Sequence, residues 1–140
     1  MPKKSKTILI VDDSPVMQKM TEKQLMNNNF KVYSAYTGAE CFNEAKSKLP
    51  DIILMDVILP DSNGKDIVRK LRIDPDTKNI PVIFTTNTLD LKSDDGSQYF
   101  EVDGQKYRAF AKPLHYRKLM STIHKEINRS LHGGKLPPEK

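Results

Sequence analysis

The fold is decided by the stretch TILIVDDSP, residues 7–15. Its first five residues form an apolar run rich in β-branched side chains, which predicts a buried strand. The run stops abruptly at two acids, Asp12 and Asp13. Ser14 followed by Pro15 then predicts the start of a helix, because serine caps helix N-termini and proline at the first helical position leaves no N–H unpaired. A buried strand therefore passes through an acidic turn directly into a helix.

The same pattern continues along the chain. A second apolar run ends on an acid, Asp56, and no polar residue interrupts its centre, as expected when helices cover both faces of a parallel sheet. The predicted strands are Thr7–Val11, Lys31–Ala35, Asp51–Met55 and Pro81–Thr86. The predicted helices begin at Ser14, at Thr37, at Lys65 and near His115. Strands that alternate with helices at this spacing indicate right-handed βαβ units and a doubly wound α/β fold.

The segment after the fourth strand departs from this rhythm, because a fourth helix is expected there. Two runs of alternating character, Gln98–Val102 and Gln105–Ala109, flank Asp103 and Gly104 instead. Asp-Gly is a favoured two-residue hairpin turn. We therefore predict a β-hairpin near residues 98–110 in place of the helix.

Length and composition fit a single domain. Hydrophobic residues make up 37% and charged residues 29% of the 140 residues, close to the usual share in globular proteins. We expect a basic N-terminal tail at residues 1–6, one domain over residues 7–131, and a C-terminal tail or the start of a linker at residues 132–140. No apolar run approaches the roughly 18 residues needed to span a bilayer, so we expect no membrane insertion and a cytoplasmic location.

The net charge of +5 does not indicate a nucleic-acid-binding protein. Its excess lies at the two ends, since residues 1–6 hold three lysines and residues 112–140 hold seven Lys or Arg against two Glu. The middle of the chain is mildly acidic and lacks the continuous basic face with interleaved aromatic residues that nucleic-acid binding needs. We therefore expect no direct contact with nucleic acid.

Acidic residues at the ends of two predicted strands indicate a binding site. Ligands bind open α/β sheets beyond the carboxyl ends of the strands. If the first and third strands are neighbours, Asp12, Asp13 and Asp56 converge there and repel one another unless a cation joins them. Magnesium suits few carboxylates, because it keeps several waters and completes its octahedron with phosphate oxygens. Lys112 at the end of the last strand and Thr86 at the end of the fourth strand can supply an amine and a hydroxyl.

These groups fit a phosphoacceptor. Phosphoryl transfer needs mainly positioning and neutralisation of oxygens, and a carboxylate, a metal, an amine and a hydroxyl supply both. A phosphatase or nucleotide-binding enzyme on the same sheet is disfavoured, because no glycine-rich phosphate loop follows the first strand. There is also no aspartate two residues beyond Asp56 to act as a general acid.

Motifs dispersed over nearly the whole chain resemble the response-regulator receiver family of two-component signalling, of the chemotaxis-regulator type. The matching motifs are VDDSP at 11–15, LMDVILPDSNG at 54–64, PVIFTT at 81–86 and Lys112-Pro113. The resemblance implies a five-stranded parallel sheet in the flavodoxin-like order 2-1-3-4-5. In this chain the hairpin near residues 98–110 would replace the fourth helix.

The resemblance also implies a role for each site residue. Asp56 would take a phosphoryl group from a sensor histidine kinase or a phosphotransfer protein. The implied ligands of Mg²⁺, or of Mn²⁺ in its place, are Asp13, Asp56 and the backbone carbonyl of Ile58, with Asp12 assisting through water. Thr86 would turn toward the phosphoryl oxygens and Lys112 would pair with them, which shifts a two-state surface toward an unknown downstream protein. Such a protein is a phosphoacceptor switch that takes part in its own phosphorylation and dephosphorylation, rather than an enzyme.

Three positions depart from the family pattern. The aromatic switch residue usually found three positions before the lysine is Ala109 here. Tyr107 lies two residues earlier on the same strand face, and it becomes the switch candidate together with Thr86. Ile58 and Thr88 occupy positions that influence hydrolysis of the phosphoaspartate in this family. Neither is acidic or an amide, so we expect a long-lived phosphorylated form.

An alternative is a receiver-like adaptor that binds a partner through the 90–110 segment without phosphorylation. The alanine at position 109 and the missing helix favour this alternative. The complete set of three acids, a threonine and a lysine argues against it, because a scaffold without phosphorylation has no physical reason to keep them together.

Overall fold

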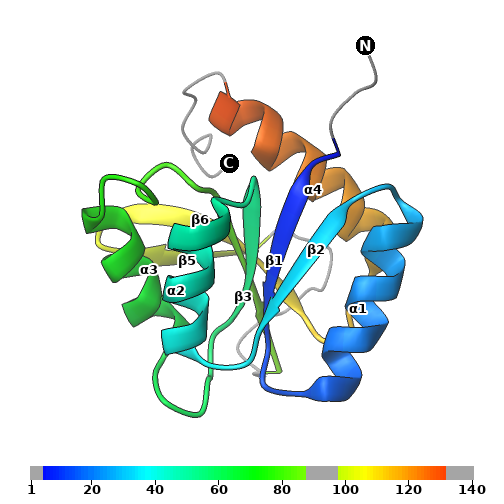
Figure 1. Cartoon of the computed structure of the whole chain (residues 1–140), viewed down its shortest axis with the longest axis horizontal. Coiled ribbons are helices and arrows are strands. Elements are labelled where there is room, and N and C mark those ends of the chain that lie inside the picture. Colours follow the sequence, from blue (N-terminus) through cyan, green and yellow to red (C-terminus); the bar gives the residue numbers. More distant parts are fainter. Residues whose placement is uncertain (1–4, 88–97, 132–140) are drawn as a thin grey trace.

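Residues 5–87 and 98–131, which the computed structural model describes, form one six-stranded sheet with helices on both faces (Figure 1). The strands are β1 (Thr7–Val11), β2 (Lys31–Ala35), β3 (Ile52–Asp56), β4 (Val82–Thr86), β5 (Gln98–Val102) and β6 (Gln105–Ala111). The helices are α1 (Pro15–Asn27), α2 (Gly38–Lys48), α3 (Gly64–Ile73) and α4 (Tyr116–Leu131). The expected tail at 132–140 and most of the one at 1–6 lie outside the described residues.

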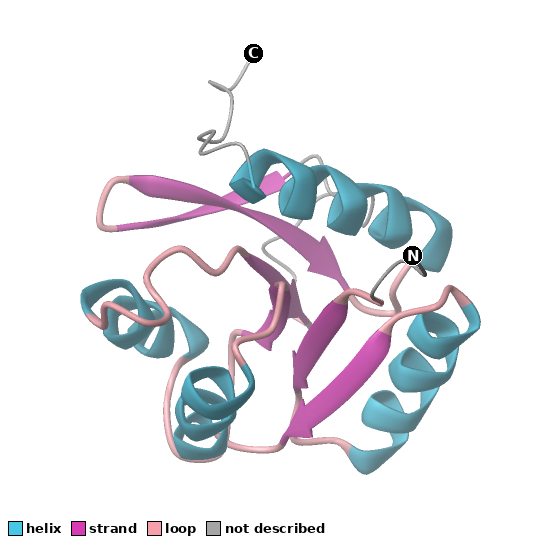
Figure 2. Ribbon diagram, turned by 45° about the horizontal axis from the view of Figure 1, so that its top comes forward, coloured by secondary structure: helices cyan, strands magenta, loops and turns pink. Residues whose placement is uncertain are grey.

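The strand order is β2-β1-β3-β4-β6-β5. The first five of these strands are parallel, and only β5 runs antiparallel to its neighbour β6. With β6 counted as the fifth parallel strand, the predicted order 2-1-3-4-5 is confirmed. The predicted hairpin is confirmed as well, and its first arm adds the sixth strand at the sheet edge (Figure 2).

The hairpin has the turn and the register that its sequence predicts. Asp103 and Gly104 have positive φ values of 51° and 85°, as a type I′ turn requires of both central residues. Glu101 lies opposite Lys106, and the next pair along the ladder is formed by two aromatic residues, Phe100 and Tyr107. The Asp-Gly turn and the alternation of the two arms therefore determine this part of the fold locally.

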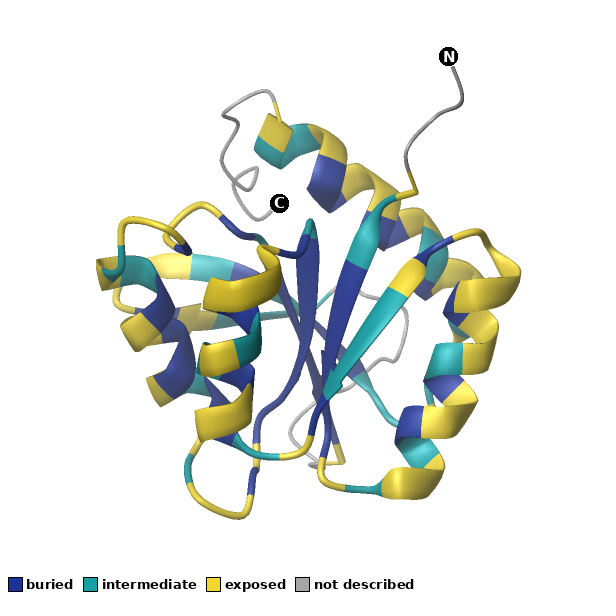
Figure 3. Ribbon diagram, in the orientation of Figure 1, coloured by how far each residue is buried: buried dark blue, intermediate teal, exposed yellow. Residues whose placement is uncertain are grey.

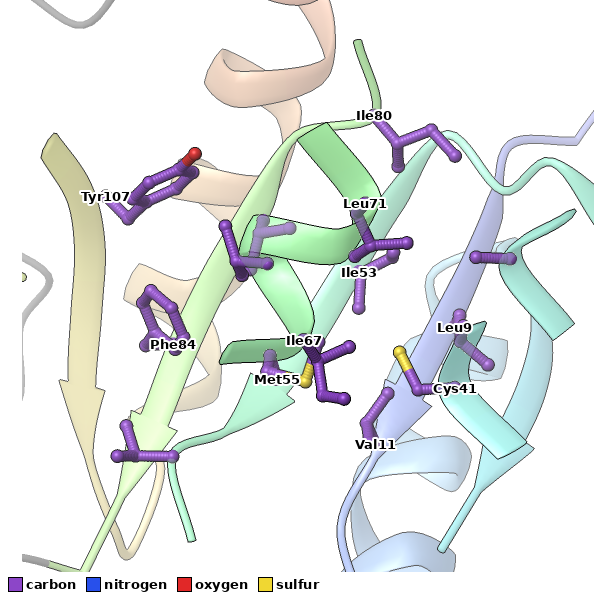
Figure 4. Packing of buried hydrophobic residues seen from close by; sticks show 14 of the residues in the cluster. Leu9, Val11, Cys41, Ile53, Met55, Ile67, Leu71, Ile80, Phe84 and Tyr107 are labelled. Atoms are coloured by element: carbon purple, nitrogen blue, oxygen red, sulfur yellow. The ribbon is translucent and has the colours of Figure 1, made fainter. Parts of the chain in front are cut away.

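Two hydrophobic cores lie on the two faces of the sheet, because successive strand side chains point to opposite faces. One core packs under α2 and α3 and contains Tyr107 and Ala109 (Figure 4). The other packs under α1 and α4 and contains Phe110. The strands β3 and β4 are buried along their whole length, while the helices are exposed on their outer faces (Figure 3).

Polar side chains fix the starts of the first two helices. The hydroxyl of Ser14 accepts a hydrogen bond from the N–H of Met17 at 3.2 Å, so the predicted cap of α1 is confirmed. Thr37 caps α2 in the same way through the N–H of Glu40 at 3.1 Å. The Glu40 carboxylate reaches back to the N–H of Tyr36 at 2.8 Å.

No helix within residues 5–87 and 98–131 has the length and apolar character needed to cross a membrane.

Candidate functional site: an acidic pocket at the carboxyl edge of the sheet

The acidic residues meet because β1 and β3 are adjacent and parallel. Val11 at the end of β1 pairs with Met55 in β3, so Asp12 and Asp56 leave the sheet side by side. Carboxylate oxygens of Asp12, Asp13 and Asp56 all lie within 4.8 Å of one another. Asp12 and Asp56 are buried and Asp13 is exposed, which gives the cluster a solvent-facing side. The structure thus brings together the three acids that the sequence singled out.

Lys112 completes this cluster from the end of β6. Its backbone N–H donates to the carbonyl of Thr86 at 2.9 Å, which holds the lysine beside the end of β4. Its ammonium nitrogen donates to Oδ2 of Asp12 at 2.6 Å and to Oδ2 of Asp56 at 2.9 Å. The ammonium group of Lys112 therefore bridges two buried carboxylates at the ends of two different strands, β1 and β3.

Burial and pairing act against each other on the ionisation of these groups. Burial raises the pKa of Asp56 above its ordinary value, and the hydrogen bond and charge of Lys112 offset only part of that rise. Burial lowers the pKa of Lys112, but its hydrogen bonds to Asp12 and Asp56 outweigh this effect, so the pKa of Lys112 is raised. The lysine therefore stays charged at neutral pH.

Backbone N–H groups hold the two buried carboxylates in place. Oδ1 of Asp12 accepts from the N–H of Ser14 at 2.9 Å, so the first acid is tied to the start of α1. Oδ1 of Asp56 accepts from the N–H of Ile58 at 3.3 Å, a longer and weaker contact. The carboxylate of Asp56 is thus the less restrained of the two.

Gly64 allows the loop after β3 to close against the end of that strand. A Cβ atom at this position would lie 2.3 Å from the backbone oxygen of Asp56, a distance that no side chain tolerates. The N–H of Gly64 instead donates to the carbonyl of Val57 at 2.6 Å. The close approach fixes the path of the loop that carries Ile58 past the pocket.

A cavity of about 350 Å³ opens beside the cluster. Its lining residues are Asp13, Asp56, Ile58, Thr86 and Asn87. Asn87 was not among the residues that the sequence singled out, although its place directly after the strand-ending threonine is a signal that could have found it. Thr88, which the sequence did single out, lies outside the described residues.

The donor set of the pocket fits a divalent cation. Three carboxylates stand against one ammonium group, which leaves a formal charge of −2 when all are ionised. Carboxylate oxygens are the hard ligands that Mg²⁺ takes, and the cavity leaves room for the waters that it retains. Asp13 and Asp56 line both the acidic cluster and the cavity, so a cation there would be open to an incoming ligand.

Tyr107 lies on the expected strand face but far from the mouth of the pocket. Its ring is buried edge-on against Phe84, with ring centroids 5.7 Å apart. Its hydroxyl accepts a hydrogen bond from Nε of Arg72 at 2.9 Å and points toward the amino ends of the parallel strands (Figure 4). A switch role for Tyr107 stays a prediction, and it would require this hydrogen bond to break.

Comparisons with known proteins agree with the fold and the pocket. The family model of the response regulator receiver domain matches residues 8–124. Protein PilH of Pseudomonas aeruginosa is 34% identical over 119 residues, which are 83% of this chain and 93% of PilH. The response regulator PleD of Caulobacter vibrioides is 39% identical over 90 residues, which are 64% of this chain. The chain spans about a fifth of PleD, since the match covers 20% of that protein.

One solved structure of similar fold contains a magnesium ion. The receiver domain of the sensor histidine kinase PA1611 from Pseudomonas aeruginosa superposes with a TM-score of 0.76 at 26% identity, covering 89% of this chain and 99% of that one. That structure has a magnesium ion coordinated in its active site cleft.

The fold and the pocket together define a receiver domain of two-component signalling. The family match covers most of the chain and includes all three acids and the lysine of the pocket, so the chain belongs to the response regulator receiver domain family. An acidic triad of this kind is typical of the magnesium site in receivers.

Proposed function

We propose that this chain accepts a phosphoryl group on Asp56 from a histidine of a sensor kinase or phosphotransfer protein, in a reaction that needs Mg²⁺ or Mn²⁺. The proposal is carried by one observation, the ammonium group of Lys112 within hydrogen-bonding distance of Asp56 at the edge of an open acidic cavity. This arrangement supports the proposal, because phosphoryl transfer to an aspartate needs a carboxylate, a positive charge and open space next to each other.

Each residue of the pocket has a distinct part in the transfer. A carboxylate oxygen of Asp56 attacks the phosphorus, the bond from phosphorus to the donor histidine nitrogen breaks, and an acyl phosphate forms. A bound Mg²⁺ would be held by Asp13, Asp56 and the backbone carbonyl of Ile58, with Asp12 assisting through water, and would supply neutralising charge to the phosphoryl oxygens. Lys112 pairs with the phosphoryl oxygens after it releases its present contact with Asp56.

The hydroxyl of Thr86 is the second group that would respond to phosphorylation of Asp56. Its strand end lines the cavity, and its backbone carbonyl already holds the N–H of Lys112. A turn of this hydroxyl toward the phosphoryl group would change the packing at the ends of β4 and of β6, the second arm of the hairpin. This coupling would carry the switch to the output surface, with Tyr107 as the candidate second member.

Intact mass measured after treatment with acetyl phosphate tests the acceptor. The wild-type chain should gain one phosphate mass with Mg²⁺ present and none with excess EDTA. Asp56→Asn should gain none, while Asp76→Asn, a matched change at an exposed acid outside the pocket, should behave as the wild type. An adduct that persists in Asp56→Asn would falsify the assignment of the acceptor.

The phosphorylated form should be long-lived. The side chain of Ile58 is apolar and 65% exposed beside the cavity, so it cannot orient an attacking water. Ile58→Asn supplies an amide at this position and should speed the loss of the phosphoryl group several-fold. The measurement is the decay of the phosphate adduct after the donor is removed, and equal decay in both proteins would contradict the proposed role of position 58.

A phosphorylation-independent adaptor that binds a partner through the 90–110 segment is the second candidate. It is favoured by the β5–β6 hairpin in place of a helix and by Ala109 at the position where an aromatic residue is usual. The acetyl phosphate experiment separates the two, because an adaptor of this kind gains no phosphate mass under any metal condition.

A further inference from the structure

β5 is one of the two edge strands of the sheet, and among the described residues it pairs with another strand only along its inner edge. Val102 pairs with Gln105 next to the two-residue turn, so hydrogen bonds to β6 are exchanged by residues 98, 100 and 102. The backbone N–H and C=O groups of Tyr99 and Glu101 consequently point outward. Within residues 5–87 and 98–131, no backbone hydrogen bond from a turn, loop or cap reaches either residue.

In the described part of the chain, this outer edge lacks most of the usual protection against strand addition. Natural edge strands are guarded by proline, charged side chains (lysine above all), a bulge or very short length. β5 reads QYFEV, which contains one charged residue, Glu101, but no proline and no lysine, and its five residues pair with β6 without a bulge. Tyrosine, phenylalanine and valine favour extended backbone. The edge is therefore a ready template for another strand.

We propose that two copies of this chain associate through antiparallel pairing of their β5 strands, so that the two sheets become one. The outward groups of Tyr99 in one copy then exchange hydrogen bonds with those of Glu101 in the second copy, and the reverse holds by symmetry. Four intermolecular backbone hydrogen bonds form around a two-fold axis at Phe100. The pairing does not involve the acidic pocket, so it does not rest on the proposed phosphoryl transfer.

The strand sequence selects this register over its neighbours. In the register centred on Phe100, each of the five residues of β5 lies opposite a residue of the second β5. Gln98 of each copy then lies opposite Val102 of the other. A register centred on Glu101 would set two like charges directly opposite, which is destabilising. A register centred on Tyr99 would pair only three residues of each β5. A shift by one residue would set Tyr99 and Glu101 opposite residues whose backbone groups point toward β6, so the intermolecular hydrogen bonds could not form.

Charges across the proposed junction are complementary on the α4 side of the sheet. Glu101 lies opposite Lys106 on its own hairpin. In the proposed register its other neighbour is Tyr99 of the second copy, and the guanidinium of Arg108 lies over the ring of that tyrosine at 5.3 Å from the centroid. Each row thus runs from Lys106 and Glu101 of one copy to Tyr99 and Arg108 of the other, where Arg108 also pairs with Glu126 of its own copy, and symmetry gives two such rows.

The opposite face brings the two Phe100 rings together at the axis. Phe100 is only partly buried, 5.8 Å from Phe84 between ring centroids, with Nζ of Lys65 at 4.6 Å from its own centroid. Contact with the second ring would cover its remaining surface. The small number of contacts predicts a weak dimer whose population depends on protein concentration.

Sedimentation equilibrium over a concentration series of the unphosphorylated chain tests the proposal. Glu101→Pro removes one outward N–H from each copy and leaves the ladder to β6 intact, because that N–H does not face β6. It should raise the dissociation constant by about tenfold or more, since two of four hydrogen bonds are lost. Glu101→Ala keeps the N–H and loses only the exposed side-chain charge, so it should raise the dissociation constant less than Glu101→Pro does. A wild type that is monomeric at every concentration, or a dimer equally strong in Glu101→Pro, overturns the proposal.

Cross-linking with cysteine tests the register independently. The two positions 100 face each other as a non-hydrogen-bonded pair, whose close Cα spacing suits a disulfide, whereas the two positions 101 are offset along the strands. Phe100→Cys should therefore form a covalent dimer on mild oxidation much faster than Glu101→Cys. The native Cys41 is fully buried and does not compete. Faster linkage through position 101 overturns the register centred on Phe100.

Discussion

The ammonium nitrogen of Lys112 lies 2.9 Å from Oδ2 of Asp56, and 56 residues of sequence separate the two. Both side chains are nearly enclosed, with 6% and 9% of their surfaces exposed. An enclosed ion pair adds little net stability compared with an apolar pair, but the removal of one partner leaves the other charge without compensation. The effect is larger here because the same ammonium group also pairs with Asp12.

Lys112→Met should therefore destabilise the chain strongly when no divalent cation is present. Asp12 and Asp56 would keep their burial and lose their counter-charge, and we expect the free energy of unfolding to fall by about 3 kcal/mol. Urea unfolding at neutral pH in the presence of EDTA measures this fall in the free energy of unfolding. Lys125→Met, at an exposed position of α4, is the matched control and should change stability by less than about 0.5 kcal/mol. Equal effects of the two substitutions would contradict the central role of the ion pair.

Asp13→Asn should have opposite effects on stability without and with magnesium. Without a divalent cation it removes a negative charge within 4.8 Å of two others, so the melting temperature should rise. With Mg²⁺ the wild type gains stability from binding, by about 1.4 kcal/mol at ten times the dissociation constant, and the variant should gain much less. Thermal melts in EDTA and in MgCl₂ test both signs. A magnesium-induced rise in Asp13→Asn as large as in the wild type would exclude Asp13 as a ligand.

Features that depend on local sequence were predictable. Thr7–Val11 and Lys31–Ala35 form strands with the predicted bounds, because the apolar runs end at polar turns. The Asp-Gly turn determined the hairpin and its register without any knowledge of the rest of the sheet. The convergence of the acids followed from one topological assumption, that β1 and β3 are neighbours, and the structure has this arrangement.

Contacts that depend on the exact meeting of distant elements were not predictable. Apolar side chains do not mark the buried face of α1, because Met20 is 50% exposed and the buried positions of the helix include Gln18 and Thr21. A glutamine gives no apolar signal. It can be buried here only because carbonyl groups at the ends of β1 and β2 accept its amide protons, and that geometry appears only when the sheet is assembled.

Gln18→Met should show how much the hydrogen bonds of this buried amide contribute to the free energy of unfolding. Its Nε2 lies 3.0 Å from the carbonyl oxygen of Ile10, 3.1 Å from that of Asp12 and 2.7 Å from that of Ala35. Methionine fills similar space but donates no hydrogen bond, so we expect a loss of about 2 kcal/mol in the free energy of unfolding. Gln18→Glu should cost more at neutral pH, because a carboxylate would face the same carbonyl oxygens.

Chemical denaturation measures both variants, with Lys19→Met at the next, exposed position as the control for added apolar surface. A variant Gln18→Met as stable as the wild type would show that water replaces the amide at no cost. In that case the glutamine would not be what joins α1 to the ends of β1 and β2.

The carboxylate of Asp61 should make the stability of the chain depend on pH, because it caps α2 from the loop between β3 and α3. Its Oδ1 accepts from the N–H of Gly38 at 2.8 Å and its Oδ2 from the N–H of Ala39 at 3.1 Å. These two hydrogen bonds hold the pKa of Asp61 below its ordinary value. A carboxyl group with a lowered folded-state pKa stabilises the chain above its unfolded pKa, and this stability is lost as the pH falls through the folded value.

Asp61→Ala should therefore be less stable than the wild type at pH 7, by an amount that stays constant down to about pH 4 and shrinks below it. Thr37→Ala removes the other cap of the same helix, a neutral hydroxyl, so its deficit should not change with pH over this range. Urea unfolding of the three proteins between pH 3 and pH 7 gives the comparison. Parallel deficits for the two variants at every pH would mean that the charge of Asp61 does not contribute, and that the loop and α2 are joined by packing alone.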